Sequence, residues 1–371
     1  MNKSTAQFRE RLNRRLGEKI FLDAQKDLIE RKLDRKRTVP VAATVLSLAI
    51  LASPFVSITL GVLLIATTFP NVFAIIIGLV MVGIGYFLLP IRHRRLEGLL
   101  ERSELPATFH LLDQITDRMG TEPITHVMVT PDFNAFMLHT TGKRVIGIGA
   151  VLWRATTPEE RLAILAHEVA HQVNGDPARS GLTGKALHTL EGWLWFLEPD
   201  ADELFAEIIM YFPFLIVSGL HRLLLRLIFF ESQRSEYLAD ALGACVAGVP
   251  ASLSALQKSM LGERIAVARL EMHANRVPGG LALVDRFAYA ITGIPVRERD
   301  AFIAKANAEK LTVDSTHPPT AYRIAFLDLL SDADAPVFGP DELRDSDSEL
   351  EGQFAKQGDN LQREIQIEEG W

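Results

Sequence analysis

Cysteine is nearly absent from this sequence: among 371 residues there is one, Cys245, which cannot form a disulfide within the chain. A small secreted scaffold held together by disulfides is therefore excluded, and a single thiol is consistent with a reducing compartment. Because Cys245 stands in a run of alanines and glycines, we expect it to be a buried packing residue rather than a nucleophile.

Charge is absent from one long stretch. Residues 38–91 contain no Asp, Glu, Lys, Arg or His, and at about 20 residues per crossing this stretch can traverse a bilayer twice. A break near residues 67–71 divides it, so we predict a two-helix transmembrane hairpin over residues 39–91. The stretch begins too late and is too long for a cleaved signal peptide.

The flanks of the hairpin predict its orientation. Basic clusters at residues 31–37 and 92–95 lie on either side of it, and Lys and Arg favour the cytoplasmic side of a membrane. We therefore expect a multi-pass protein of the cell (inner) membrane, with the lipid bilayer as a partner and everything after residue 95 in the cytoplasm.

Residues 1–38 are basic, with twelve Lys and Arg against six Asp and Glu, although the whole chain has a net charge of -7. Phe8, Leu12, Leu16 and Ile20 recur every four positions, which predicts a basic amphipathic cytoplasmic segment. It lies on the anionic inner leaflet, packs on the soluble domain, or forms a solvated linker helix. No basic and aromatic pattern accompanies these charges, so we expect no nucleic-acid partner.

The segment Leu165-Ala166-His167-Glu168-Val169-Ala170-His171 has the spacing of a catalytic metal site. On a helix His167 and His171 project from one face and can share a metal ion, and Glu168 can activate a metal-bound water. The helix is predicted by Thr157-Pro158-Glu159-Glu160, which offers an N-cap hydroxyl, a proline at the first position and a capping-box carboxylate. The alternative is an ordinary core helix that carries two histidines.

Two histidines leave a zinc ion one protein ligand short, because catalytic zinc sites commonly use three and keep one position for water. Glu236 is the best third ligand. Asp240 follows one helical turn later on the same face, where it can accept the free N–H of a ligand histidine and fix its ring. Two imidazoles, one carboxylate and an open position suit zinc best, so we expect one Zn²⁺ per chain.

His317 and Arg323 are further candidates, because Pro318-Pro319 stiffens the chain before a helix and can hold both near the metal. Their role is either to stabilise the oxyanion of a tetrahedral intermediate or to hydrogen-bond Glu236 or Asp240. The remaining histidines lack a partner at ligand spacing and are expected to be surface or structural residues: His110, His126, His139, His188, His221 and His273.

The rest of the chain predicts a mainly α fold with a small β-sheet. A helix is expected over residues 96–119, followed by short strands near residues 124–129, 136–138 and 145–148. Residues 204–230 are apolar but interrupted by charges, so re-entrant or membrane-surface packing and a buried helix stay open, and a span is disfavoured. Residues 331–371 are acidic and polar, which predicts an acidic mobile tail.

Four motifs occur in one order along residues 96–330: Asn134-Ala135-Phe136, the HEVAH segment with Asn174-Gly175-Asp176, the stretch Ser232 to Asp240, and Thr316-His317-Pro318-Pro319 with Arg323. Together they resemble the HtpX/CAAX-protease-type family of membrane zinc metallopeptidases. The resemblance implies an α+β zincin-like metalloprotease domain over residues 92–330. It also implies roles for individual residues: zinc ligands His167, His171 and Glu236, general base Glu168, a supporting Asp240, and assisting His317 and Arg323.

The leading hypothesis is a membrane-anchored zinc endopeptidase that hydrolyses peptide bonds of membrane or misfolded proteins. Its protein or peptide substrate would extend along Asn134, Ala135 and Phe136 and add its backbone to a sheet edge. Such binding reads main chain, which favours broad specificity, as in membrane-protein quality control, although the same family includes prenyl-protein processing. The alternatives are a non-catalytic zinc-dependent membrane scaffold and, more weakly, a transporter or channel component.

Overall fold

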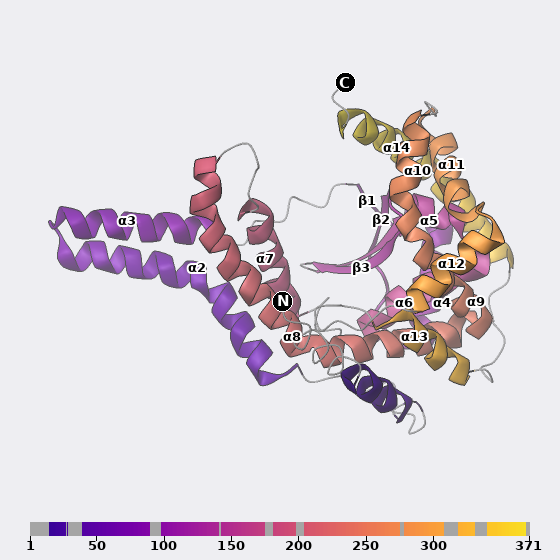
Figure 1. Cartoon of the computed structure of the whole chain (residues 1–371), viewed down its shortest axis with the longest axis horizontal. Coiled ribbons are helices and arrows are strands. Elements are labelled where there is room, and N and C mark those ends of the chain that lie inside the picture. Colours follow the sequence, from indigo (N-terminus) through magenta and orange to yellow (C-terminus); the bar gives the residue numbers. More distant parts are fainter. Residues whose placement is uncertain are drawn as a thin grey trace. The chain divides into compact units, whose positions relative to one another are not determined.

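The structure, a computed structural model, describes residues 15–26, 28, 39–89, 98–140, 142–174, 181–197, 204–274, 278–307, 318–330 and 340–368. The chain divides into two compact units (Figure 1). Unit 1 contains residues 1–37, 98–176 and 233–371, and unit 2 contains residues 38–97 and 177–232. The predicted peptidase domain 92–330 is therefore interrupted, because residues 177–232 group with the hairpin.

Unit 2 begins with the predicted hairpin, α2 (Val41–Thr68) and α3 (Val72–Phe87), which run side by side (Figure 1). The two helices touch at small residues: a Cβ on Gly61 would lie 2.5 Å from the Gly78 carbonyl oxygen. In a lipid bilayer the hydrophobic effect does not drive helices together, so van der Waals contact at small residues supplies the attraction between them. By length and composition α2 is apolar enough to cross a membrane, and α3 is a shorter apolar helix.

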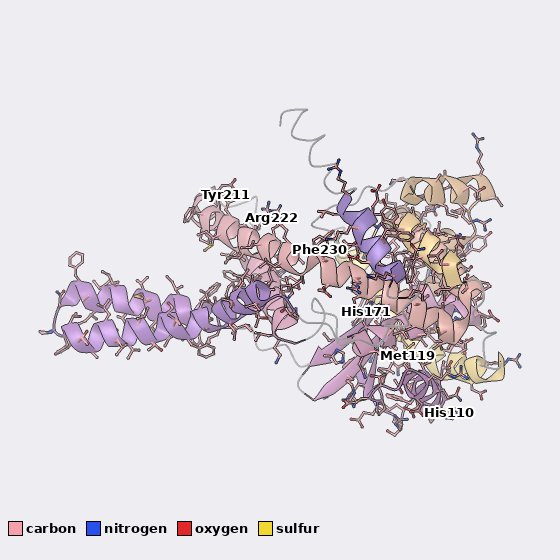
Figure 2. The ribbon with its side chains drawn as sticks, turned by 90° about the horizontal axis from the view of Figure 1, so that it is seen from below. His110, Met119, His171, Tyr211, Arg222 and Phe230 are labelled. Atoms are coloured by element: carbon pink, nitrogen blue, oxygen red, sulfur yellow. The ribbon has the colours of Figure 1, made fainter. Side chains whose placement is uncertain are left out.

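The remainder of unit 2 is α7 (Gly181–Leu197), which packs on α2, and the first part of α8 (Leu204–Ala247). Residues Met210–Ala247 of α8 also pass the test of length and composition for a span. Figure 2 labels Tyr211, Arg222 and Phe230 along its apolar part. In the later part Cys245 is exposed, so our expectation of a buried packing role is wrong.

Unit 1 contains one sheet with the strand order β1 (Leu99–Leu100), β2 (His126–Thr130), β4 (Lys143–Gly149), β3 (Ala135–Thr140). β2 and β4 are parallel, and the outer strands are antiparallel to their neighbours. β3 is an edge strand, and among the described residues no strand pairs with its outer side. The predicted strands are confirmed, but the first predicted helix starts only at Pro106, because Leu99 and Leu100 pair with β2.

One face of this sheet carries the core of unit 1. Val127, Met137 and Ile146 alternate toward it and are buried together with residues of α4 (Pro106–Met119) and α6 (Pro158–Asn174). Further helices complete the unit: α5 (Ala150–Ala155), α9 (Val249–Ser259), α10 (Ile265–Ala274), α11 (Leu281–Thr292), α12 (Val296–Asn307) and α13 (Thr320–Leu327), with 3₁₀ turns at Met260–Arg264 and Asp328–Leu330.

The predicted mobile tail over residues 331–371 is wrong for its described part, which is α14 (Pro340–Glu368). Four apolar side chains at helical spacing lie buried in the core: Leu350, Phe354, Leu361 and Ile365. Its acidic residues are also engaged, since the Glu349 carboxylate accepts the backbone N–H groups of Ala107 and Thr108 at 2.7 and 2.8 Å. The prediction weighed charge and overlooked this apolar spacing.

The N-terminal segment is described as helical over residues 15–26. Ile20 and Ala24 are buried in unit 1, and the Phe21 ring stacks on Tyr322 at 5.8 Å and meets Tyr237 edge-on at 6.1 Å. Of the three placements left open for residues 1–38, the described part shows packing on the rest of unit 1.

Candidate metal centre

The helix α6 starts at the predicted capping box. The backbone N–H of Thr157 donates to Glu160 at 2.7 Å, and the N–H of Glu160 donates to the Thr157 hydroxyl at 3.3 Å. Lys258 and Ser254 of α9 also donate to the Glu160 carboxylate. Burial alone would raise the pKa of Glu160, but these donors outweigh it and lower that pKa below its ordinary value. This anchored start fixes the helix that carries both histidines.

Three side chains converge two turns further along α6. The Nε2 atoms of His167 and His171 are 3.2 Å apart, and the Glu236 carboxylate oxygens lie 3.6 Å from the first and 3.5 Å from the second. Around a tetrahedral zinc ion with ligands at 2.0–2.1 Å, neighbouring ligand atoms are about 3.4 Å apart. The two distances to Glu236 end on different carboxylate oxygens, yet all three distances lie close to this spacing, and the three residues form a group able to hold a metal ion.

Glu236 reaches this point because α8 passes very close to α6. A Cβ on Gly243 would lie 3.4 Å from the His167 backbone nitrogen, in ordinary contact. The neighbouring Ala239 and Ala244 are completely buried. This run of small residues therefore packs tightly on α6, and the contact falls one turn beyond Asp240.

Asp240 and Arg323 orient the first histidine. Asp240 lies 3.1 Å from His167 Nδ1, which leaves Nε2 directed toward Glu236. Arg323 donates to both oxygens of Asp240 at 2.8 and 2.6 Å and lies 3.5 Å from Glu236. Two parallel bonds of this kind fix geometry as well as charge. The position of Arg323 thus corresponds to the hydrogen-bonding role among the two that the sequence left open.

The electrostatics of the cluster favour a cation. Burial would lower the pKa of His167, but Asp240 and Glu236 outweigh it and raise that pKa to about 9. Burial also opposes the charge of Arg323, yet Asp240 together with Glu236 and Glu168 raises its pKa above the ordinary value. When both imidazoles are neutral, as metal-binding histidines are, the three buried carboxylates and the one guanidinium leave the group with a net charge of -2. A divalent ion bound by two imidazoles and a carboxylate fits both the geometry and this charge.

Of the other predicted site residues, the structure describes the three of the edge strand but not His317. Asn134 precedes β3, where its carbonyl oxygen accepts the Gly149 N–H at 2.9 Å, and Ala135 opens this edge strand. The Phe136 ring lies over Gly147, whose Cβ would be 2.3 Å from it. These residues present a strand edge as predicted, while His317 lies outside the described residues.

Sequence reasoning missed Asp347 of α14, whose carboxylate binds the helix α6 that carries both histidines. Its carboxylate accepts both Arg161 Nη1 and Trp153 Nε1 at 2.6 Å. Arg161 lies in α6, two turns before His167. The two partners are far apart in sequence, and a single acidic residue in an acidic segment carries no signal that would single it out.

This fold and this three-residue group define a peptidase domain with a candidate divalent metal centre on adjacent helices. The model of peptidase family M48 matches residues 110–331, well over half of the chain, so the chain belongs to peptidase family M48. The predicted resemblance is thereby confirmed.

Relatives agree with this family. A protease HtpX homolog of Gemmatimonas aurantiaca is 27% identical over 239 residues, which are 62% of this chain and 77% of the relative. Protease HtpX of Xanthomonas oryzae pv. oryzae and that of Xanthomonas campestris pv. campestris are each 26% identical over 189 residues, which are 48% of this chain and 64% of the relative. No solved structure matches the chain.

Proposed function

We propose that this M48 peptidase is a membrane-anchored zinc endopeptidase that cleaves unfolded or membrane proteins at the cytoplasmic face. The observation that carries the proposal is the convergence of His167, His171 and Glu236 at tetrahedral spacing next to the buried Glu168. A zinc ion held by these three residues would polarise the scissile carbonyl of the substrate and lower the pKa of the attacking water.

In the proposed mechanism the chain's own residues have distinct roles. Glu168 accepts a proton from the attacking water and delivers it to the leaving amine. Asp240 keeps the His167 ring in its binding orientation, and Arg323 holds Asp240. The edge strand at Asn134, Ala135 and Phe136 binds extended substrate through its backbone, with His317 as a further assisting residue.

Membrane attachment supports the proposed substrates and location. The hairpin α2–α3, with basic flanks on both sides, holds unit 1 at the inner face of the cell membrane, where segments of membrane proteins emerge. Main-chain recognition at a strand edge suits many sequences, as quality control requires. The alternative of a non-catalytic zinc-dependent scaffold gives no reason for a buried carboxylate at position 168.

The test compares Glu168→Gln with wild type in the detergent-purified full chain, using an unfolded model membrane protein as substrate. We expect cleavage to fall at least about a hundredfold while bound zinc stays near one per chain. The matched control is Glu159→Gln, an exposed glutamate of the same helix, which should cleave normally. Normal cleavage by Glu168→Gln would refute the mechanism, and bound zinc without cleavage in the wild type would favour the scaffold.

A further inference from the structure

The N-terminal helix, described over residues 15–26, contacts both α8 and α13 within unit 1 (Figure 1, where this helix is indigo). On its inner face Ile20 and Ala24 are 3% and 0% exposed, whereas Leu22 on the outer face is 59% exposed. The helix is therefore amphipathic, and it packs its apolar face on the unit that contains the metal centre.

Phe21 stands at the centre of this contact. Its ring stacks on Tyr322 of α13 with 5.8 Å between the ring centroids, and it meets Tyr237 of α8 edge-on at 6.1 Å. Tyr237 also packs on Phe326 of α13 at 5.1 Å. Aromatic rings attract each other at centroid distances of about 4.5–7 Å, so the four rings form one aromatic cluster that joins three segments of the chain.

The aromatic cluster lies next to the metal centre. Tyr237 directly follows the candidate ligand Glu236, and Tyr322 directly precedes Arg323. Arg323 in turn binds both oxygens of Asp240 at 2.8 and 2.6 Å. Successive residues of a helix point about 100° apart, so the rings and the charged groups occupy neighbouring faces of the same two helices. The rings therefore set the separation of α8 and α13 that the pair of Arg323 and Asp240 has to bridge.

The short helix α13 depends on such contacts for its position. It has eight residues, and its N-cap Pro319 makes no side-chain capping hydrogen bond. A helix of this length is not stable by itself, so packing must hold it. Phe326 near its end is completely buried, whereas Tyr322 in its first turn is only partly buried and receives the ring of Phe21. Phe21 thus packs on the turn of α13 that carries Arg323.

We propose that Phe21 is a positioning residue of the metal centre. Its ring joins α13 to α8 and thereby keeps Arg323 on Asp240, which orients the ring of His167. The inference rests on the proposed function in one respect, the binding of zinc by the three candidate ligands. The N-terminal segment is then a part of the metal-binding unit rather than only a linker to the hairpin.

The experiment measures the zinc affinity of the detergent-purified full chain by competition with a chromogenic chelator. Phe21→Ala should bind zinc about tenfold more weakly than the wild type, because Arg323 loses its fixed position. Two variants should bind zinc as the wild type does: Phe21→Tyr, which keeps the ring, and Leu22→Ala, at the exposed neighbouring position. Equal affinities for Phe21→Ala and the wild type would overturn the inference.

A core variant separates this effect from a general loss of stability. Phe287 of α11 is 2% exposed and belongs to the core of unit 1. Phe287→Ala leaves a cavity, so it should lower the melting temperature of the metal-free chain at least as much as Phe21→Ala does. Its zinc affinity should nevertheless stay that of the wild type. If Phe287→Ala weakens zinc binding as much as Phe21→Ala, the role of Phe21 is general and the inference is wrong.

A double variant tests whether Phe21 acts through Arg323. Arg323→Lys has already lost the two parallel bonds to Asp240. In this background Phe21→Ala should weaken zinc binding by less than about twofold, whereas independent effects would multiply and give a further loss of about tenfold, which would overturn the inference. A wild type that binds no zinc would refute the metal site and the proposed function with it. Zinc bound equally by the wild type and Phe21→Ala would refute only the role of Phe21.

Discussion

At the scale of the residue, Arg323 is the outermost member of a chain of contacts that ends at the metal position. Its guanidinium binds both oxygens of Asp240, one of these oxygens faces His167 Nδ1, and the opposite ring atom faces Glu236. Each contact restricts the rotation of the next side chain in this series. A ligand whose direction is set in this way binds metal without first having to be ordered.

Replacing Arg323 by Lys should therefore weaken metal binding although the charge is kept. A single ammonium cannot bond both oxygens of Asp240 in the fork geometry of a guanidinium. We expect zinc affinity, measured by competition with a chromogenic chelator, to fall by about 10- to 100-fold. Arg154→Lys, in the more exposed pair with Asp285, is the control and should bind zinc as the wild type does. Unchanged affinity in Arg323→Lys would mean that Asp240 is oriented by other groups.

At the scale of the element, local signals predicted the helices that position the site. The capping box at Thr157 and Glu160 and the charge-free run of residues 38–91 each specify a structure within a short window. The helix α14 escaped prediction because its acidic composition outweighed the helical spacing of its apolar residues, and the distant groups that bind its carboxylates, such as Arg161 and the start of α4, could not be read from the sequence. No window of sequence contains both partners. The same reason hid Asp347 from the candidate site.

The capping box leads to a prediction for pH. The pKa of Glu160 is below its ordinary value of 4.5, so its stabilisation is fully present above about pH 4.5 and disappears as pH falls through the lowered pKa. Glu160→Gln should lower stability by about 1–2 kcal/mol near pH 7, and this difference should vanish in strong acid. Thermal unfolding in detergent across this pH range measures it. A constant difference for Glu160→Gln across this pH range would contradict the assignment.

A second prediction concerns α14. Phe354 is 1% exposed and packs against Trp153, so Phe354→Ala leaves a cavity and should destabilise unit 1 by about 3–5 kcal/mol. The control is Glu351→Ala, on the exposed side of the same helix, which should change stability by less than about 0.5 kcal/mol. Thermal unfolding in detergent distinguishes the two. Equal melting temperatures for both variants would restore the mobile tail that composition alone predicts.

At the scale of the whole molecule, the metal centre limits how the chain crosses the membrane. His171 precedes residues 177–232 and Glu236 follows them, yet the two side chains are 3.5 Å apart. If residues 177–232 enter the bilayer, they would therefore have to cross it an even number of times. Two crossings would require α7, but this helix has 17 residues and contains Lys185, His188 and Glu191. Its length of about 25 Å falls short of a hydrocarbon core of about 30 Å. We infer that residues 177–232 enter or cover the inner half of the membrane and return.

Single cysteines placed in a Cys245→Ser background test this topology with a membrane-impermeant maleimide on intact cells. A cysteine at Asn71, in the turn of the hairpin, should be labelled from outside if the proposed topology holds, in which both basic flanks of the hairpin lie in the cytoplasm. Under the same proposed topology, cysteines at Glu351 of unit 1 and at Tyr211 of α8, which are both exposed positions, should be labelled only after permeabilisation. Labelling of Tyr211 from outside would show that α7 and α8 form a second hairpin, with the metal centre still cytoplasmic. Labelling of Glu351 from outside would reverse the orientation of the peptidase and place its substrates on the other side of the membrane.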